Sequence, residues 1–104
     1  MKKICIFISL VFLNLNFQSL KADEMYDLGK NVFLNKANCS SCHVLDDANS
    51  QGQIGPNLDK IKPELIRVLN VVSMGIGVMP AFEGILTDEE IKSVSYYVFK
   101  STNK

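Results

Sequence analysis

The sequence predicts a small all-α domain in which short helices are joined by long loops. Three stretches, residues 24–35, 63–74 and 88–100, space their apolar side chains at the three- and four-residue intervals of an amphipathic helix. No stretch alternates apolar and polar residues in the manner of a half-buried strand. The intervening residues 46–60 and 75–85 are rich in residues that favour turns, glycine and proline among them.

The first predicted helix has an apolar face and one unexpected glycine. The residues on the face are Met25, Leu28, Val32 and Phe33. Gly29 lies inside the helix, although glycine there is less favourable than alanine by about 1 kcal/mol. We therefore expect another element to cross the first helix closely at Gly29.

The other two helices are marked by their ends. Pro63 is predicted as the first residue of the second helix, because a proline there loses no hydrogen bond, and Gly75 as the residue that ends it. Thr87 and Glu90 have the spacing of a capping box at the start of the last helix. The apolar face of that helix consists of Ile91, Val94, Tyr97 and Val98.

Residues 1–22 have the layout of a secretory signal peptide. Two lysines precede residues 4–13, which are apolar except for Ser9, and we expect cleavage after Ala22. The apolar run is too short to span a bilayer, which needs about 20 residues. The alternative is an uncleaved anchor. On the signal-peptide interpretation, residues 23–104 form an exported mature domain.

The mature chain is expected to be one small and mildly acidic domain. Removing residues 1–22 leaves 82 of the 104 residues, and it removes three of the eleven basic residues and no acidic one, which makes the net charge −3. Domains of this size often need a disulfide, a metal or a cofactor for stability. The lack of a basic stripe argues against a nucleic-acid partner.

The stretch NCSSCHVL, residues 38–45, has several possible chemistries. A thioredoxin-type pair of cysteines belongs to a sheet fold, and this sequence predicts no sheet. A structural zinc site needs about four ligands, whereas the mature chain offers Cys39, Cys42 and its one histidine, His43. A plain disulfide would leave His43 unexplained.

Covalent attachment of haem uses all three residues of this motif. Two thiols at the spacing of Cys39 and Cys42 can form thioethers with the two vinyl groups, and His43 then follows as the proximal ligand of the iron. We therefore expect one covalently bound haem c per chain.

A second axial ligand would have to be a methionine, because no second histidine exists. Met79 lies in an irregular loop between Gly77 and Pro80, where a side chain can be aimed at a cofactor without straining a helix. Met74, at the end of the second helix, is expected to face the core. There are three alternatives: Met79 is simply part of the core packing, Met74 is the ligand, or the sixth site is open and suited to small ligands or peroxide. A His/Met pair raises the reduction potential and leaves no place for a substrate, which favours one-electron transfer.

In these motifs and their order, the chain resembles the class I c-type cytochromes, which are small proteins with a single haem. The matching stretches are GKNVF (29–33), CSSCH (39–43), GPNL (55–58), MPAF (79–82) and LTDEEIKSVSYYV (86–98). The last stretch is most similar to carriers of the cytochrome c6 and c553 type. The resemblance implies the cytochrome c fold, with short helices and loops wrapped around one covalently bound haem.

The resemblance also implies roles for individual residues. The carbonyl of Pro56 should accept a hydrogen bond from Nδ1 of His43, which fixes the imidazole. Leu58 and Phe82 should line the haem. The residues expected where the terminal helices cross are Gly29, Phe33, Val94 and Tyr97.

The chain departs from many relatives in having no tryptophan to contact a haem propionate. The candidates for that contact are Asn57, Lys60, Lys62 and Arg67. The acidic runs at residues 46–47 and 88–90 are interpreted as a solvated loop and a helix start rather than as a docking patch.

From the motifs and the resemblance we expect a monomeric periplasmic electron carrier rather than an enzyme. It should pass single electrons between redox proteins such as membrane cytochrome complexes, dehydrogenases or oxidases, with no stable membrane insertion once the signal is removed. The thylakoid lumen is the alternative compartment. The alternative functions are a dedicated cytochrome subunit of a larger redox enzyme, and a ligand-binding or peroxidatic haem protein if Met79 does not bind the iron.

Overall fold

The structure is a computed structural model that describes residues 21–104. Residues 1–20 of the predicted signal peptide lie outside this range, so its presence and its cleavage after Ala22 stay predictions. Within residues 21–104, no helix combines the length and the apolarity that crossing a membrane requires.

Short helices make up most of the described chain, as the all-α prediction requires. Residues 21–31 are α-helical and continue into a π-helical turn, η1 (Val32–Lys36). The elements that follow are η2 (Cys39–Ser41), β1 (Val44–Leu45), η3 (Asp46–Ala48), β2 (Ser50–Gln51), α2 (Leu58–Ile61), α3 (Leu65–Met74) and α4 (Asp88–Thr102).

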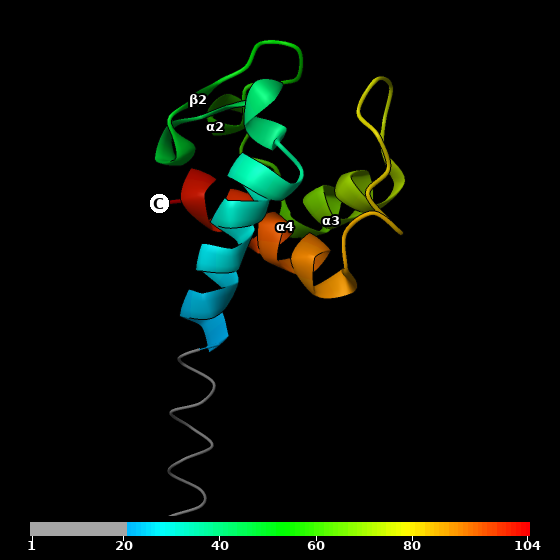
Figure 1. Ribbon diagram of the computed structural model, residues 1–104. Helices are drawn as coiled ribbons and strands as arrows, with labels where there is room; N and C mark the ends of the chain where they lie inside the picture. Colours follow the sequence, from blue (N-terminus) through cyan, green and yellow to red (C-terminus); the bar gives the residue numbers. More distant parts are fainter. Residues whose placement is uncertain (1–20) are drawn as a thin grey trace, which may run out of the picture.

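The first helix crosses α4 at a steep angle, and Gly29 makes the close approach possible (Figure 1). A Cβ built on Gly29 would overlap the carbonyl of Ser93 and would come within 2.6 Å of the Cβ of Tyr97. One turn further along, the ring of Phe33 packs edge-on against the ring of Tyr97, with 5.8 Å between centroids. The predicted crossing is therefore confirmed, and it explains the glycine.

The hydrophobic core forms where α3 and α4 pack together and where the first helix and η1 pack against α4. Its most deeply buried apolar residues are Val32, Phe33, Leu45, Val94 and Tyr97. Val68 and Val72 come from consecutive turns of α3 and join the same cluster.

The C-terminus of α3 and the N-terminus of α4 agree with the sequence prediction. The hydroxyl of Thr87 accepts a hydrogen bond from the backbone N–H of Glu90 at 3.1 Å, and the Glu90 carboxylate accepts one from the N–H of Thr87 at 2.9 Å. This is the predicted capping box. Gly75 caps the C-terminus of α3 with φ +74°, a conformation that a side chain disfavours.

The predicted start of the second helix at Pro63 is wrong by two residues. Glu64 is extended and acts as the N-cap, so α3 begins at Leu65. The physical reason is the preceding helix α2, which ends in a left-handed Lys62 with φ +43°. Pro63 therefore lies in the connection between the two helices.

The prediction of loop throughout residues 46–60 is also too simple. This segment contains η3, β2 and α2, and β1 and β2 form a two-residue antiparallel ladder. The hydroxyl of Ser50 supports the ladder by donating to the carbonyl of His43 at 2.9 Å. A two-residue ladder is too short to produce an alternating pattern, which is why the sequence did not indicate it.

Met74 does not face the core, contrary to the prediction. Its side chain is 68% exposed, whereas Val68 and Val72 are buried. Met74 follows Val72 by two residues, which places it about 200° further round the helix. It therefore points to the opposite side.

Candidate functional site

An apolar cavity of about 190 Å³ opens between η2, α2, α3 and α4. α3 contributes Val68, Val71 and Val72 to its lining, and α4 contributes Val94 and Val98. A second hollow of about 400 Å³ adjoins it, because five lining residues belong to both. The shared residues are Cys39, His43, Pro56, Ile76 and Met79.

The CSSCH motif forms a tight turn at the wall of this cavity. The backbone N–H groups of Cys42 and His43 both donate to the carbonyl of Cys39, at 3.1 and 3.0 Å. This turn brings Cys39 and His43 to the same cavity, while Cys42 lines the adjoining hollow. Both cysteines are free thiols. Burial raises the pKa of the Cys39 thiol to about 11, because apolar surroundings disfavour the thiolate.

The imidazole of His43 is held by the backbone of Pro56. Nδ1 lies 2.7 Å from the Pro56 carbonyl oxygen, which can only accept a hydrogen bond, so Nδ1 carries the proton. In the neutral ring Nε2 is then the nitrogen with a free lone pair. The hydrogen bond predicted between these two residues is therefore present, and it leaves Nε2 available to a metal.

Met79 reaches the same cavity from a different segment. Ile76 and Met79 exchange backbone hydrogen bonds of 3.1 and 2.9 Å, closing a turn that contains Gly77. The Met79 side chain is partly buried against the core and lines both hollows. Met74, the alternative ligand, is exposed.

The remaining predicted site residues also meet here. Leu58 is the first residue of α2, is buried, and lines the cavity. Phe82 donates its backbone N–H to the carbonyl of Val72 at 2.9 Å and lines the adjoining hollow. All seven residues expected at the site therefore lie at the two hollows: Cys39, Cys42, His43, Pro56, Leu58, Met79 and Phe82.

Of the four candidates for a propionate contact, only Arg67 lines the cavity. The side chain of Asn57 is instead used to cap α2, where it accepts from the N–H of Lys60 at 3.2 Å. Sequence reasoning also missed the valines that form the apolar walls. Their spacing of one helical turn, on α3 and again on α4, is a signal that could have identified them.

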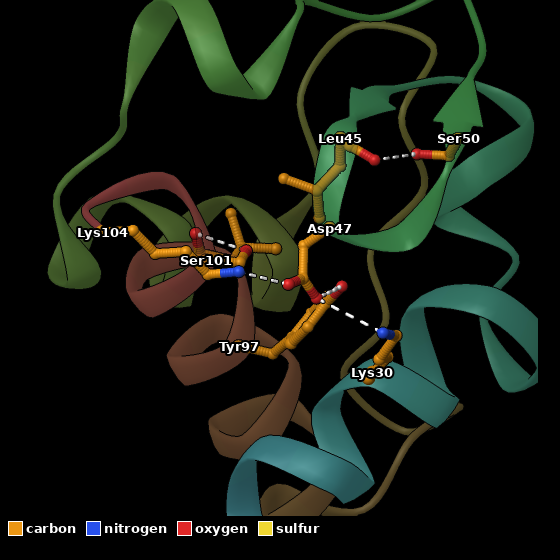
Figure 2. A network of polar contacts seen from close by, with 8 residues as sticks. Lys30, Leu45, Asp47, Ser50, Tyr97, Ser101 and Lys104 are labelled. Atoms are coloured by element: carbon orange, nitrogen blue, oxygen red, sulfur yellow. Dashed lines mark hydrogen bonds and ion pairs between the residues drawn. The ribbon is translucent and has the colours of Figure 1, made fainter.

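Away from the cavity residues described above, a polar cluster surrounds Asp47 at the junction of the first helix and α4 (Figure 2). The Asp47 carboxylate accepts hydrogen bonds from the Tyr97 hydroxyl at 2.7 Å and from the Lys104 ammonium at 2.5 Å, and the Lys30 ammonium lies 3.5 Å away. Its side chain is only 14% exposed. The interpretation of residues 46–47 as a solvated loop is therefore wrong for Asp47.

The electrostatics of Asp47 follow from these partners. Burial opposes ionisation, but hydrogen bonds from Lys104, Tyr97 and Tyr26 outweigh it and hold the pKa of the carboxyl well below its ordinary value. Burial and the same carboxylate raise the pKa of the Tyr97 phenol. The carboxylate is thus ionised and the phenol protonated at neutral pH.

The cavity and its polar groups fit a covalently attached haem. Two free thiols and an imidazole stand within one short turn, a thioether comes from another segment, and the remaining walls are almost entirely apolar. Arg67 supplies a single cation in the cavity lining. A cation there suits the propionate carboxylates of haem, whose ring is otherwise apolar. Soft sulfur and imidazole donors of this kind also suit haem iron.

Comparison with known proteins agrees with this chemistry. The family model described as "Cytochrome C oxidase, cbb3-type, subunit III" matches residues 24–98. Cytochrome c6 of Gracilaria tenuistipitata var. liui is 40% identical over 86 residues, covering 74% of this chain and 74% of the relative. Cytochrome c6 of Leptolyngbya boryana is 37% identical over 80 residues, covering 73% of this chain and 92% of the relative.

A solved structure is similar over most of the described chain. It is that of the c-type cytochrome SorU from Sinorhizobium meliloti, which superposes with a TM-score of 0.74 at 46% sequence identity. The similarity covers 79% of this chain and 95% of that one.

Proposed function

This chain belongs to the cytochrome c family as a small class I c-type cytochrome with covalently bound haem c, and from that premise we propose that it is an exported single-electron carrier with His43 and Met79 as axial ligands. When bound, haem c supplies one-electron redox chemistry. One observation carries the proposal: the fixed imidazole of His43 and the thioether of Met79 line the same apolar cavity.

The chain's own residues hold the cofactor in this proposal. Cys39 and Cys42 form the two thioether links, and His43 offers Nε2 to the iron while Pro56 fixes the ring through Nδ1. Leu58 and Phe82 exclude water from the two hollows. Arg67, which also lines the cavity, is the group we expect to pair with a propionate.

Met79 determines the kind of chemistry. A neutral thioether ligand favours ferrous over ferric iron, which raises the reduction potential. With both axial positions taken by side chains, no position is left for a substrate. The site is therefore suited to taking up and releasing an electron rather than to binding and transforming a molecule.

The rim of the site is suited to brief contact with a redox partner. No charged residue occurs in residues 48–58 or 68–82, which include two of the three segments that line the adjoining hollow, 54–56 and 76–82. Ile54 and Val78 line that hollow and are 72% and 89% exposed. Apolar contact over a small area favours a weak and transient complex. We expect the partners to be membrane cytochrome complexes, dehydrogenases or oxidases.

Export is supported by the layout of residues 1–22, which is that of a signal peptide. The periplasm is the compartment we propose, with the thylakoid lumen as the alternative. We expect the mature protein to be a monomer.

A second candidate function is a dedicated cytochrome subunit of a larger redox enzyme. It is favoured by the description of the matching family, which names a subunit of an oxidase. The two functions differ in assembly. A free carrier should elute in gel filtration at the mass of one mature chain, whereas a dedicated subunit should co-purify with its enzyme.

Replacing Met79 with Ala tests the ligation directly. We expect the midpoint potential to fall and the iron to bind carbon monoxide or cyanide readily, because the sixth position loses its thioether. Met74→Ala is the matched control, since Met74 lies five residues away and is exposed. Redox titration and ligand-binding spectra measure both variants. If Met79→Ala kept the potential and ligand resistance of the wild type, Met79 would not be the ligand.

A further inference from the structure

Gly55 lies directly against the imidazole of His43. A Cβ built on Gly55 would be 2.5 Å from Cε1 of that ring, 2.9 Å from Nδ1 and 3.0 Å from Nε2. Unbonded carbon atoms normally stay about 3.5–4.0 Å apart. The backbone of Gly55 is not in the left-handed region, so the path of the chain alone does not demand a glycine. The ring of His43 is what excludes a side chain here.

Hydrogen bonds keep the glycine and the ring in this close contact. The N–H of Gly55 donates to the carbonyl of Cys42 at 2.7 Å, and the next carbonyl, that of Pro56, accepts from Nδ1 of His43 at 2.7 Å. The N–H of His43 in turn donates to the carbonyl of Cys39 at 3.0 Å. Residues 55–56 are thus hydrogen-bonded both to the backbone of the motif and to the ring, and neither partner can withdraw without breaking a hydrogen bond.

We propose that Gly55 is a positioning residue that sets the rotation of the His43 imidazole and thereby the length of its hydrogen bond to Pro56. This inference rests on the proposed function, in which Nε2 of His43 binds the iron. A methyl group at position 55 would turn the ring or push the Pro56 carbonyl away. Either movement lengthens the hydrogen bond.

The consequence for the metal follows from the role of that hydrogen bond. A hydrogen bond at Nδ1 makes the imidazole a more basic ligand, which stabilises the ferric state most. Weakening the bond makes His43 a poorer donor, so ferric iron loses more stability than ferrous iron. The midpoint potential should therefore rise when Gly55 is replaced by alanine.

Gly52 provides a matched control in the same loop. A Cβ built on Gly52 would lie 2.5 Å from the backbone C and O of Ser41 and 2.6 Å from the backbone C of Cys42, so its three nearest atoms all belong to the backbone of the motif. Both Gly55→Ala and Gly52→Ala therefore press on the CSSCH motif. Gly55→Ala presses first on the imidazole, whereas Gly52→Ala presses first on the backbone.

The test compares the two variants with the wild type as haem-loaded proteins. Proton NMR of the ferric forms reports the orientation of an axial imidazole through its ring protons and the haem methyl groups, and a redox titration gives the midpoint potential. We expect Gly55→Ala to shift these resonances and raise the potential, whereas Gly52→Ala, which presses on the backbone of Ser41 and Cys42, shifts the imidazole resonances and the potential less. If Gly55→Ala fails to retain haem while Gly52→Ala retains it, haem binding depends on the contact between position 55 and the His43 ring, which also supports the inference.

Other outcomes would overturn the inference. It fails if Gly55→Ala keeps the wild-type resonances and potential, or if both variants show the same changes or the same loss of haem. The wild-type spectrum separates this failure from failure of the proposed function. Absence of axial imidazole signals in the wild type would remove His43 as a ligand, whereas their presence with no response to Gly55→Ala would remove only the role of Gly55.

Discussion

Asp47 joins parts of the structure that are far apart in the sequence. Its partners Tyr97 and Lys104 follow it by 50 and 57 residues, and Lys30 precedes it in the first helix (Figure 2). The cluster ties the loop that follows the CSSCH motif to both terminal helices. Because this loop leads directly from His43, we expect the Asp47 cluster to stabilise the wall of the cavity.

Replacing Asp47 with Asn should lower the free energy of unfolding at pH 7 by about 1–2 kcal/mol, because the ion pairs are lost while a hydrogen bond from Tyr97 can remain. Folding lowers the pKa of Asp47, so its ionic contribution is complete above the ordinary carboxyl pKa of about 4 and is lost as the pH falls through the lower folded value. Acidification in that window should therefore destabilise the wild type more than Asp47→Asn.

Urea unfolding at a series of pH values from about 2 to 7 measures this difference. Asp46→Asn is the control, because Asp46 is exposed and lies next to Asp47. Equal slopes of stability against pH for the wild type and Asp47→Asn would show that the carboxylate has no such role.

Single residues differ in how well the sequence predicted them. Cys39, Cys42 and His43 could be predicted because their spacing is local and has few chemical uses. The environment of Asp47 could not, because it depends on partners brought together by the whole fold. The exposure of Met74 was mispredicted although its helical phase relative to Val72 was available in the sequence.

At the scale of elements, the helix ends were predicted well where a cap is encoded by adjacent residues. Thr87 with Glu90 and the terminal Gly75 both act as expected. The start of α3 was misplaced because the conformation of Lys62, which no local pattern shows, decides where the chain turns. The short ladder between β1 and β2 depends on a side-chain hydrogen bond from Ser50 and has no periodicity to predict it.

Because the first helix crosses α4 closely at Gly29, we expect alanine at this position to destabilise the fold. Alanine at position 29 should favour the helix by about 1 kcal/mol relative to glycine. Its Cβ would nevertheless overlap the Ser93 carbonyl and crowd Tyr97, and overpacking of this kind typically destabilises by about 1–3 kcal/mol. We expect the clash to exceed the gain, so Gly29→Ala lowers the melting temperature.

Thermal unfolding followed by circular dichroism measures this change. Asn31→Ala is the control, because Asn31 is exposed in the same helix and alanine there should be neutral or slightly stabilising. A melting temperature for Gly29→Ala at or above the wild type would contradict the close crossing.

At the scale of the whole molecule, the cavity lies where the helical elements around the CSSCH motif meet. The first helix, α2, α3 and α4 each contribute apolar residues to it, and the CSSCH motif and Met79 face it from separate segments. A domain of this size buries only a modest fraction of its surface and is marginally stable by itself. We infer that the cofactor completes the core, so its covalent attachment supports the fold as well as the chemistry.

The measurement that tests the central claim most directly is the visible and far-red absorption spectrum of the protein, exported in a host with haem-attachment machinery and recorded oxidised and then reduced. We expect sharp bands in the reduced form, haem that survives acid–acetone extraction, and a weak far-red sulfur-to-iron band in the oxidised form. Covalent haem without the far-red band would contradict ligation by Met79 and favour ligand binding or peroxidatic chemistry. A colourless protein would contradict the account as a whole.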